Sequence, residues 1–384
     1  MTEHEKKIKE LEKYGSIEEW LYSQPVDEFP PYYPDKGHKS FPETYSDLKI
    51  KLIPLHKIVE KGALIATINQ WRSNLKAENV STEDREKFKD LLEHDPIIYL
   101  NQHGSGHVDK VIERAYDLIT KFTSDTLSPS EAFLLLCAMQ VHDTGNIFGR
   151  DGHEKSIRLA TINTIKPIIP DVPTQNFIYK IAQVHGGNVK GNKDTISTLR
   201  QESNFFNLPI REQLLAAILR FSDELADDSS RADDAALDLD LINNPSAIYH
   251  HYSKSLHSVR IVKNSINQTF YISLEYFINS NLITKKFTKY NSKQLLIDEI
   301  FLRTKKIELE RRYCMRFFGQ YLPLSEVRVR IEINPEHDLT ESEIIQYTLK
   351  ENGYPADEVC DCPENTGEKI IAYLKNKGWR FPNE

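Results

Sequence analysis

The sequence predicts a mainly α-helical protein whose helical core carries a small appended α+β unit. Between His107 and Leu225, apolar residues recur at the spacing of successive amphipathic helices. Beyond Ser229 the spacing changes, because Ser258–Lys263 and Thr269–Phe277 alternate or are rich in β-branched and aromatic side chains, as strands are. A chain of 384 residues has room for about two or three folded units, and one large domain with appendages also fits.

The first hundred residues predict helices interrupted by one irregular stretch. A helix is expected over Glu3–Tyr14 and another over Ser16–Tyr22, with the serine as its N-cap. The prolines of Pro25–Pro42 exclude a single helix there, since proline lacks the N–H that a helix interior needs. Helical spacing returns in Ile58–Leu75, and a further helix is expected over Ser81–Leu92.

Three segments of the core give strong helix signals. From His107 to Ile119 the apolar residues fall on one helical stripe. Ser128–Glu131 combines a capping serine, a proline and a glutamate in the order of a helix start, directly before the apolar Ala132–Val141. Pro209 precedes a third apolar helix, Leu214–Leu225.

The segment after the core predicts strands joined to one long helix. Asn264–Gln268 has the composition of a turn between the first two strands. A long helix is expected over Ser292–Phe318 and a half-exposed strand over Val327–Ile333. The order strand, strand, helix, strand is typical of a small α+β unit. We expect two more helices near the end, one starting at Thr340 and one over Glu368–Lys377.

These elements divide the chain into four expected parts. Residues 1–95 form an N-terminal helical and irregular extension, and residues 96–245 form the helical core. Residues 246–335 form the α+β unit, and residues 336–384 form a helical tail.

The composition excludes several classes of protein. Apolar residues make up 39% and charged residues 28% of the chain, as in soluble globular proteins, so the chain is expected to fold. Met1–Lys13 lacks the apolar core of a signal peptide, and no run reaches the ~18 apolar residues of a membrane span. We therefore expect a cytoplasmic protein that does not bind membranes. Four cysteines are too few for a disulfide framework, and Cys360 and Cys362 lack partners for a four-ligand zinc site.

The chain is acidic overall and basic in one segment. A formal net charge of −8 argues against binding duplex nucleic acid over the whole surface, because phosphate contacts need clustered lysine and arginine. His251–Gln320, however, holds thirteen lysine and arginine residues against five acidic ones. This segment also carries Tyr271, Tyr276, Phe277 and Tyr290. It forms either a surface that binds single-stranded nucleic acid, with the bases stacked on its rings and the backbone held by its charges, or an ordinary core with solvated charges.

Four side chains on three predicted helices indicate a metal site. His142 and Asp143 end an apolar helix, where such a pair is costly to bury unless it binds an ion or is fully hydrogen-bonded. His107 begins the first core stripe, and Asp223 interrupts the apolar helix Leu214–Leu225. Two imidazoles and two carboxylates on inward positions suit a divalent transition metal, namely Mn, Fe, Co, Ni or Zn.

The order His107, His142-Asp143, Asp223 resembles the defining pattern of the HD superfamily of metal-dependent phosphohydrolases. The resemblance covers the chain from near His107 to near Asp227. It implies that the helical core is an HD domain and that these four residues bind metal.

The flanking residues also resemble the family pattern. Val111 and Ala115 follow His107 at intervals of four, and Gly145 completes His-Asp-x-Gly at the doublet. His103 lies four residues before His107 and can share its helix face, but the register of the two apolar residues favours His107 as the ligand.

Two further histidines lie where the two-metal branches of that superfamily carry extra ligands. His153 follows the doublet by ten residues, and His185 precedes two glycines that leave backbone room for a ligand. Each is either a ligand or a solvated loop residue. The resemblance implies one ion or, with Asp143 as a bridge, two ions that activate a water molecule.

The sequence departs from those branches at one position. Many of them resemble His-Asp-x-Gly-Lys, whereas this chain has Asn146, which with Asp143 is the expected catalytic pair. The positive charge for a phosphate must then come from elsewhere, and Arg150, Lys155 and Arg220 are the candidates.

Three functions remain open at this stage. The first is hydrolysis of a phosphate ester or anhydride in a small, nucleotide-type substrate. The second is a nuclease that cuts single-stranded nucleic acid with the same metals, and the third is a module that senses a nucleotide without turnover. The sequence does not indicate an oligomeric state.

Overall fold

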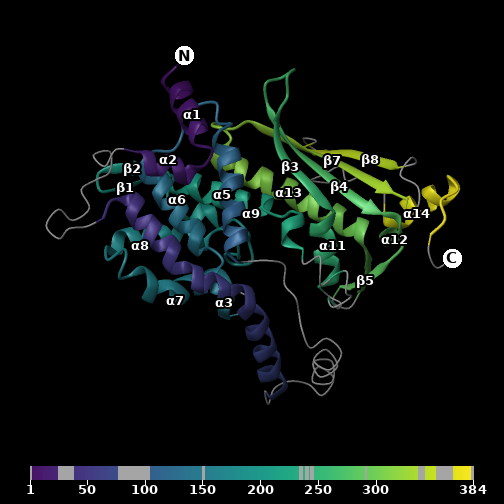
Figure 1. The fold of residues 1–384 in the computed structure, drawn as a ribbon. Coiled ribbons are helices and arrows are strands. Elements are labelled where there is room, and N and C mark those ends of the chain that lie inside the picture. Colours follow the sequence, from purple (N-terminus) through teal and green to yellow (C-terminus); the bar gives the residue numbers. More distant parts are fainter. Residues whose placement is uncertain are drawn as a thin grey trace. The chain divides into compact units, whose positions relative to one another are not determined.

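Helices dominate the part of the chain that the structure, a computed structural model, describes (Figure 1). The described residues are 2–24, 39–76, 104–148, 152–232, 237, 242, 246–289, 292–335, 342–351 and 366–381. One four-stranded sheet and two short hairpins contain the strands of these residues. The predicted fold class, mainly α with an appended α+β unit, is confirmed.

The described residues belong to two compact units. The first unit takes its residues from Met1–Lys89, Gln102–Ala226 and Cys314–Leu322, and the second from Asp90–Asn101, Asp227–Tyr313 and Pro323–Glu384. Among the described helices, none combines the length and the apolar character that crossing a bilayer requires. The division of the chain into four parts stays a prediction.

Three helices begin the first unit: α1 (Glu3–Tyr14), α2 (Ile17–Ser23) and α3 (Phe41–Lys76). The hydroxyl of Ser16 accepts a hydrogen bond from the backbone N–H of Glu19 at 3.1 Å, so Ser16 is the predicted N-cap. Pro42, expected to be irregular, lies in the first turn of α3, where a helix needs no N–H donor. Residues 25–38 and the helix expected over Ser81–Leu92 lie outside the described residues.

Five helices form the centre of the first unit: α5 (Ser105–Ile119), α6 (Pro129–Val141), α7 (His153–Ile165), α8 (Val172–Gln183) and α9 (Glu212–Leu225). Helix α6 is buried all round, from its second residue to its last, so it is the central helix of the unit. Helices α3, α5, α8 and α9 all contact it. The helices predicted from the core signals are therefore confirmed.

A short hairpin before α9 was not predicted. It consists of β1 (Ser203–Phe205) and β2 (Leu208–Ile210). The two turn residues, Phe206 and Asn207, have φ values of 49° and 69°, as a two-residue turn with positive φ at both positions requires. Glycine or asparagine usually marks the first of these positions, and Phe206 in its place hides the turn from sequence analysis.

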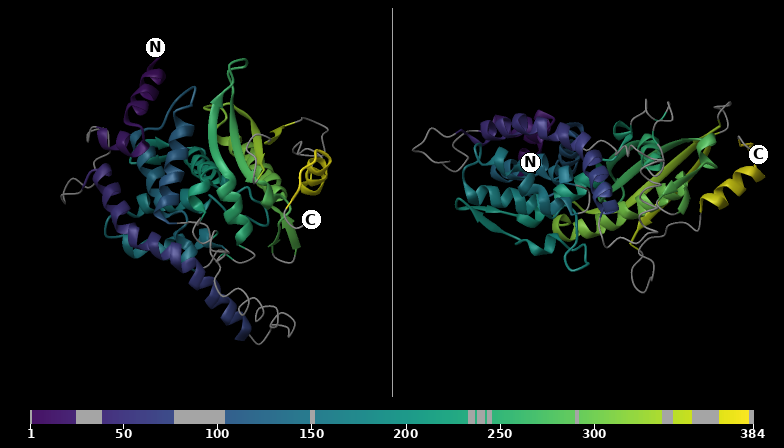
Figure 2. Two further views of the ribbon diagram at one scale, coloured as in Figure 1. Left: turned by 45° about the vertical axis from the view of Figure 1, so that its right-hand side comes forward. Right: turned by 90° about the horizontal axis from the view of Figure 1, so that it is seen from below.

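The second unit is built on a sheet in the strand order β3-β4-β7-β8 (Figure 2). The strands are β3 (Leu256–Lys263), β4 (Phe270–Asn279), β7 (Leu324–Asn334) and β8 (Glu343–Lys350). β4 and β7 pair in parallel, and the outer pairs are antiparallel. Buried residues alternate with more exposed ones along β4 and β7. Helix α13 (Leu296–Phe318) contacts the edge strand β8, since the hydroxyls of Thr304 and Tyr347 lie 2.8 Å apart.

The other elements of the second unit are short: α11 (Ala247–Ser255), α12 (Ser280–Ile283), β5 (Lys286–Lys289), β6 (Ser292–Leu295) and α14 (Gly367–Asn376). Two expectations for this unit are wrong. The first four residues of the expected long helix form β6, which pairs with β5. The helix expected from Thr340, and with it the wholly helical tail, is replaced by β8, because its β-branched and aromatic residues pair with β7.

Helix α6 begins with a buried ion pair. Ser128 caps its first turn by accepting from the backbone N–H of Glu131, whose carboxylate accepts in return from the backbone N–H of Ser128. The same carboxylate accepts hydrogen bonds from Arg211 at 2.6 and 2.8 Å, and Glu131 is only 2% exposed. One glutamate therefore joins the start of the central helix to the start of α9.

We expect Glu131→Ala to lower the free energy of unfolding by about 3–5 kcal/mol, because it leaves Arg211 part-buried without its main partner. Urea denaturation followed by circular dichroism measures this loss. Ser128→Ala is the matched control, since it removes the cap alone and should cost only about 1 kcal/mol. Equal losses in the two variants would contradict the role given to the ion pair.

Candidate metal centre

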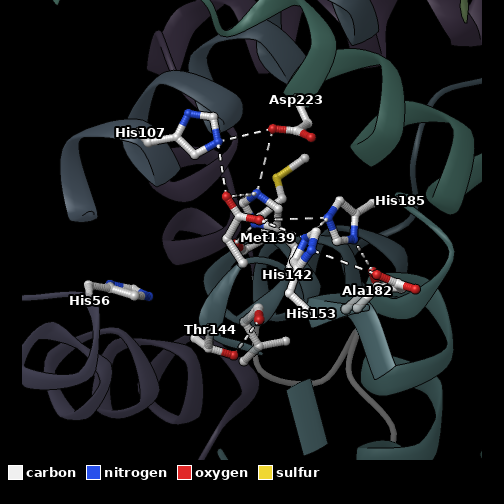
Figure 3. A network of polar contacts seen from close by, with 12 residues as sticks. His56, His107, Met139, His142, Thr144, His153, Ala182, His185 and Asp223 are labelled. Atoms are coloured by element: carbon white, nitrogen blue, oxygen red, sulfur yellow. Dashed lines mark hydrogen bonds and ion pairs between the residues drawn. The ribbon is translucent and has the colours of Figure 1, made fainter. Parts of the chain in front are cut away.

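The ends of three helices bring the predicted ligands together inside the first unit (Figure 3). His107 lies in the first turn of α5, His142 is the C-cap of α6, and Asp143 follows it directly. Asp223 lies in the last turn of α9. The two histidines and Asp143 are buried, whereas the side chain of Asp223 is 29% exposed.

The first group of ligand atoms combines two imidazoles with two carboxylates. Nε2 of His107 lies 3.0 Å from Oδ1 of Asp223 and 3.7 Å from Oδ2 of Asp143. Nε2 of His142 lies 3.7 Å from each of the same two oxygens. These atoms form a compact donor set of nitrogen and oxygen, as transition-metal sites do.

Two further histidines approach the other oxygen of Asp143. His153 opens α7, and His185 follows the end of α8. Nε2 of His153 lies 3.2 Å and Nε2 of His185 lies 3.7 Å from Oδ1 of Asp143. The ligand atoms of His107, His142 and Asp143 lie within 4.8 Å of one another. The ligand atoms of Asp143, His153 and His185 do so as well. Asp143 thus belongs to both groups, with a different oxygen in each.

Backbone carbonyls orient two of the imidazoles. Nδ1–H of His142 donates to the carbonyl of Met139 at 2.7 Å, and Nδ1–H of His185 donates to the carbonyl of Ala182 at 2.6 Å. In the neutral ring, each bond leaves the lone pair on Nε2, the atom that faces Asp143. Metal-binding histidines are typically held in this way through their second nitrogen.

The first group has perturbed acid–base properties. Burial lowers the pKa of His142, but the carboxylates of Asp143 and Asp223 outweigh this effect and raise the pKa to about 9. Burial also disfavours the ionised form of Asp223, yet the imidazoles of His107 and His142 hold its pKa well below the usual range. At neutral pH a cation that binds Nε2 of His142 therefore displaces a proton.

These residues fit a divalent metal ion. Nε2 of His142 is buried and makes no hydrogen bond, because the nearest carboxylate oxygens lie 3.7 Å away. Leaving a buried polar atom without a partner costs about 1–3 kcal/mol. A cation shared with the two carboxylates would take this nitrogen as a ligand and remove that cost.

Two glycines allow the ligand-bearing segments to approach one another. After the His-Asp doublet the chain turns through the 3₁₀ helix η2 (Thr144–Phe148), which packs against α7. A Cβ at Gly145 would lie 1.9 Å from the carbonyl oxygen of His153, so any side chain there would push this ligand away. Gly187 has a φ of +70°, and its Cβ would lie 2.5 Å from the carboxylate of Glu154, the residue after His153. The glycine of His-Asp-x-Gly therefore serves to place the second group.

The other predicted site residues have different surroundings. Asn146 is buried within η2, three residues after Asp143. Lys155 is exposed on the first turn of α7. Arg150 and the alternative ligand His103 lie outside the described residues. The roles of these residues in catalysis and phosphate binding stay predictions.

Arg220 contacts the loop that follows His185. Its guanidinium donates to the carbonyl of Lys193 at 3.0 Å and to the hydroxyl of Thr195 at 2.9 Å. The hydroxyl of Thr195 in turn donates to the carbonyl of Val184 at 2.8 Å. Arg220 lies one turn before Asp223, so it ties α9 to the segment that carries His185.

The sequence analysis missed His56, a buried histidine of α3. Its Nε2 lies 2.7 Å from the carbonyl oxygen of Gln140, near the end of α6. It continues a buried stripe formed by Leu48, Leu52 and Val59. That spacing is the signal that could have found it, because a polar residue on a buried stripe needs a buried partner.

Comparison with known proteins identifies one family. The model of the HD-CE family matches residues 95–305, a region that contains both groups of ligand atoms. No curated protein and no solved structure matches the chain. The match covers more than half of the 384 residues and includes an HD-type arrangement of histidines and aspartates, so the chain belongs to the HD-CE family.

Proposed function

We propose that the protein is a metal-dependent phosphohydrolase that cleaves a phosphate ester or anhydride of a nucleotide-type substrate. The observation that carries the proposal is the position of Asp143, whose two oxygens each face a different pair of histidines. A carboxylate shared in this way supports a centre for two divalent ions. Membership in the HD-CE family supports the assignment to HD-type hydrolases.

The residues of the centre divide the work of binding. His107, His142 and Asp223 would hold the first ion, His153 and His185 would hold the second, and Asp143 would contribute to both. Bound divalent ions supply Lewis-acid activation of the phosphate and of the attacking water. The chain supplies orientation, because two of the imidazoles, His142 and His185, are held by backbone carbonyls.

We propose that polar neighbours of the centre contact the phosphate. The amide of Asn146 can donate a hydrogen bond where related enzymes carry a lysine charge. Lys155 lies on the first turn of α7, and its exposed side chain is free to reach an anionic ligand. Arg220 donates to Lys193 and Thr195, which favours a role in holding the loop over direct contact with substrate.

The lysines of the second unit give little support to a nuclease. Lys286 pairs with Glu368 at 3.4 Å, and Lys289 pairs with the buried Glu299 at 2.6 Å. Lys285 lies 5.4 Å from the centre of a phenylalanine ring. Much of the positive charge that would track a nucleic-acid backbone is therefore used within the protein.

The aromatic residues of this unit point the same way. Tyr276 is fully buried, and the ring of Tyr271 is covered by the guanidinium of Arg328 at 3.8 Å. Phe277 is 37% exposed and packs on a histidine ring, while Tyr290 lies outside the described residues. The three rings that the structure describes do not form an open row on which bases would stack.

We expect Asp143→Ala to abolish both metal retention and hydrolysis, because this carboxylate supplies charge to both groups. Metal content is measured by mass spectrometry, and turnover by phosphate release from a panel of nucleotides. Asp109→Ala is the control, since Asp109 is a carboxylate of α5 with a 60% exposed side chain. Retained metal and activity in Asp143→Ala would overturn the proposal, and metal without turnover in the wild type would favour the sensing module.

We expect His153→Ala and His185→Ala each to lower the metal content from about two ions per chain towards one, since the second group loses a ligand. The exposed His257 provides the matched control, and His257→Ala should leave the stoichiometry unchanged. A wild-type protein with a single ion would restrict the centre to the first group.

We expect replacement of Lys285, Lys286 and Lys293 by glutamate to leave turnover of a small substrate within a few fold. Lys289 is kept, because its pair with the buried Glu299 is structural. Binding of the small substrate should also depend only weakly on salt, whereas a bound polymer releases counterions and shows a steep dependence. A loss of roughly a hundredfold with the metals still bound, about 2.7 kcal/mol, would favour the nuclease instead.

A further inference from the structure

The last turn of α6 leads directly into the candidate metal centre, because His142 is the C-cap of this helix. The final carbonyl groups of a helix have no donors within the helix and need partners elsewhere. Two of these carbonyls are satisfied locally. Nδ1–H of His142 donates to Met139 at 2.7 Å, and the hydroxyl of Thr144 donates to Val141 at 2.6 Å.

The carbonyl between these two is satisfied from α3. Nε2–H of His56 donates to the carbonyl of Gln140 at 2.7 Å, across a separation of 84 residues. A carbonyl only accepts, so Nε2 of His56 carries a proton. Burial lowers the pKa of His56, which favours the neutral ring. Figure 3 shows His56 set apart from the other labelled histidines, and His56 belongs to neither group of ligand atoms.

The side chain of Gln140 is held by the same helix. Its Nε2–H donates to the hydroxyl of Tyr45 at 3.0 Å, and that hydroxyl donates to Glu18 of α2. Tyr45 and His56 lie about three turns apart on one face of α3. Tyr45, His56 and Gln140 are all buried, so water does not replace these bonds readily.

Helix α3 also packs against two segments next to the second group. It contacts η2, which follows Asp143, and α7, which begins with His153. The described part of α3 lies outside the region matched by the HD-CE family, residues 95–305. A segment beyond the family match thus borders the turn on which the centre depends.

We propose that His56 is a positioning residue for the metal centre. By capping the carbonyl of Gln140 it fixes the last turn of α6, and with it the directions in which His142 and Asp143 point. The effect on metal binding rests on the proposed function, whereas the effect on the orientation of His142 does not. His185 offers an internal standard, because its Nδ1–H makes the same kind of bond to Ala182 without a contact to His56.

The test compares His56→Leu, which removes the donor, with His56→Gln, which keeps an N–H at a similar reach. The histidines are labelled with ¹⁵N, the protein is stripped of metal with a chelator, and solvent exchange of the Nδ1–H signals is measured. We expect His56→Leu to speed the exchange of His142 and to leave His185 unchanged, and His56→Gln to restore the wild-type rate. Unchanged exchange of His142 in His56→Leu would overturn the proposal.

A second arm measures the affinity for Mn²⁺ by calorimetry. We expect His56→Leu to bind about tenfold more weakly, in the range typical of residues that orient ligands from behind, and His56→Gln to bind as the wild type does. Tyr45→Phe is the control, because it removes the contact to the side chain of Gln140 and leaves its carbonyl capped. Tyr45→Phe should lower the melting temperature without weakening Mn²⁺ binding. If Tyr45→Phe and His56→Leu weakened Mn²⁺ binding equally, His56 would have a role in stability alone.

Each outcome separates the two proposals. If the wild type binds no divalent metal, the proposed function fails, and the exchange measurement still decides the role of His56. If His56→Leu does not fold, His56→Asn replaces it, because asparagine is polar but too short to reach Gln140. Identical exchange of His142 in His56→Asn and His56→Gln would then overturn the positioning role.

Discussion

The burial of Asp143 among four imidazoles is the constraint on which the first unit depends. An ionised carboxylate that is only 6% exposed is costly unless positive charge or hydrogen bonds compensate for it. The chain meets this demand by ending or beginning four helices around one side chain, with α5 and α7 contributing histidines of their first turns, α6 its C-cap and α8 the histidine that follows its end. Helix α6 carries His142 at its end and is surrounded by the other helices of the unit. Residues on all sides of α6 are therefore buried.

The sequence predicted the cluster of histidines and aspartates better than it predicted the residues that support this cluster. His107, His142-Asp143 and Asp223 stand out because each places an ionisable group on an apolar helix, where such a group needs a reason. His56 was missed because its partner is a backbone carbonyl 84 residues away, and a carbonyl leaves no mark in the sequence. The strand β8 was missed for a related reason. Thr340 and the glutamate after it are local signals of a helix start, whereas the pairing of β8 with β7 joins distant segments and leaves no local signal.

The second unit shows why a charge count along a segment does not describe a surface. Several basic residues of the segment 251–320 pair with acidic partners, some of them from outside the segment. Glu299 alone accepts from Lys289 and Arg303 while being 1% exposed. Several cations of this unit therefore lie in ion pairs within the protein, and the local excess in the sequence overstates the positive charge available on a surface.

The backbone at the helix ends sets the orientation of two imidazoles in the centre. His142 and His185 are each fixed by a carbonyl one turn earlier in their own helix, so the direction of Nε2 follows the direction of the helix end. A residue that holds the last turn of such a helix, as His56 holds the carbonyl of Gln140, can therefore act on the centre without being part of it. The contact of His56 with Gln140 would act through this link, so that α3, which lies outside the family match, would support the end of α6 that carries His142.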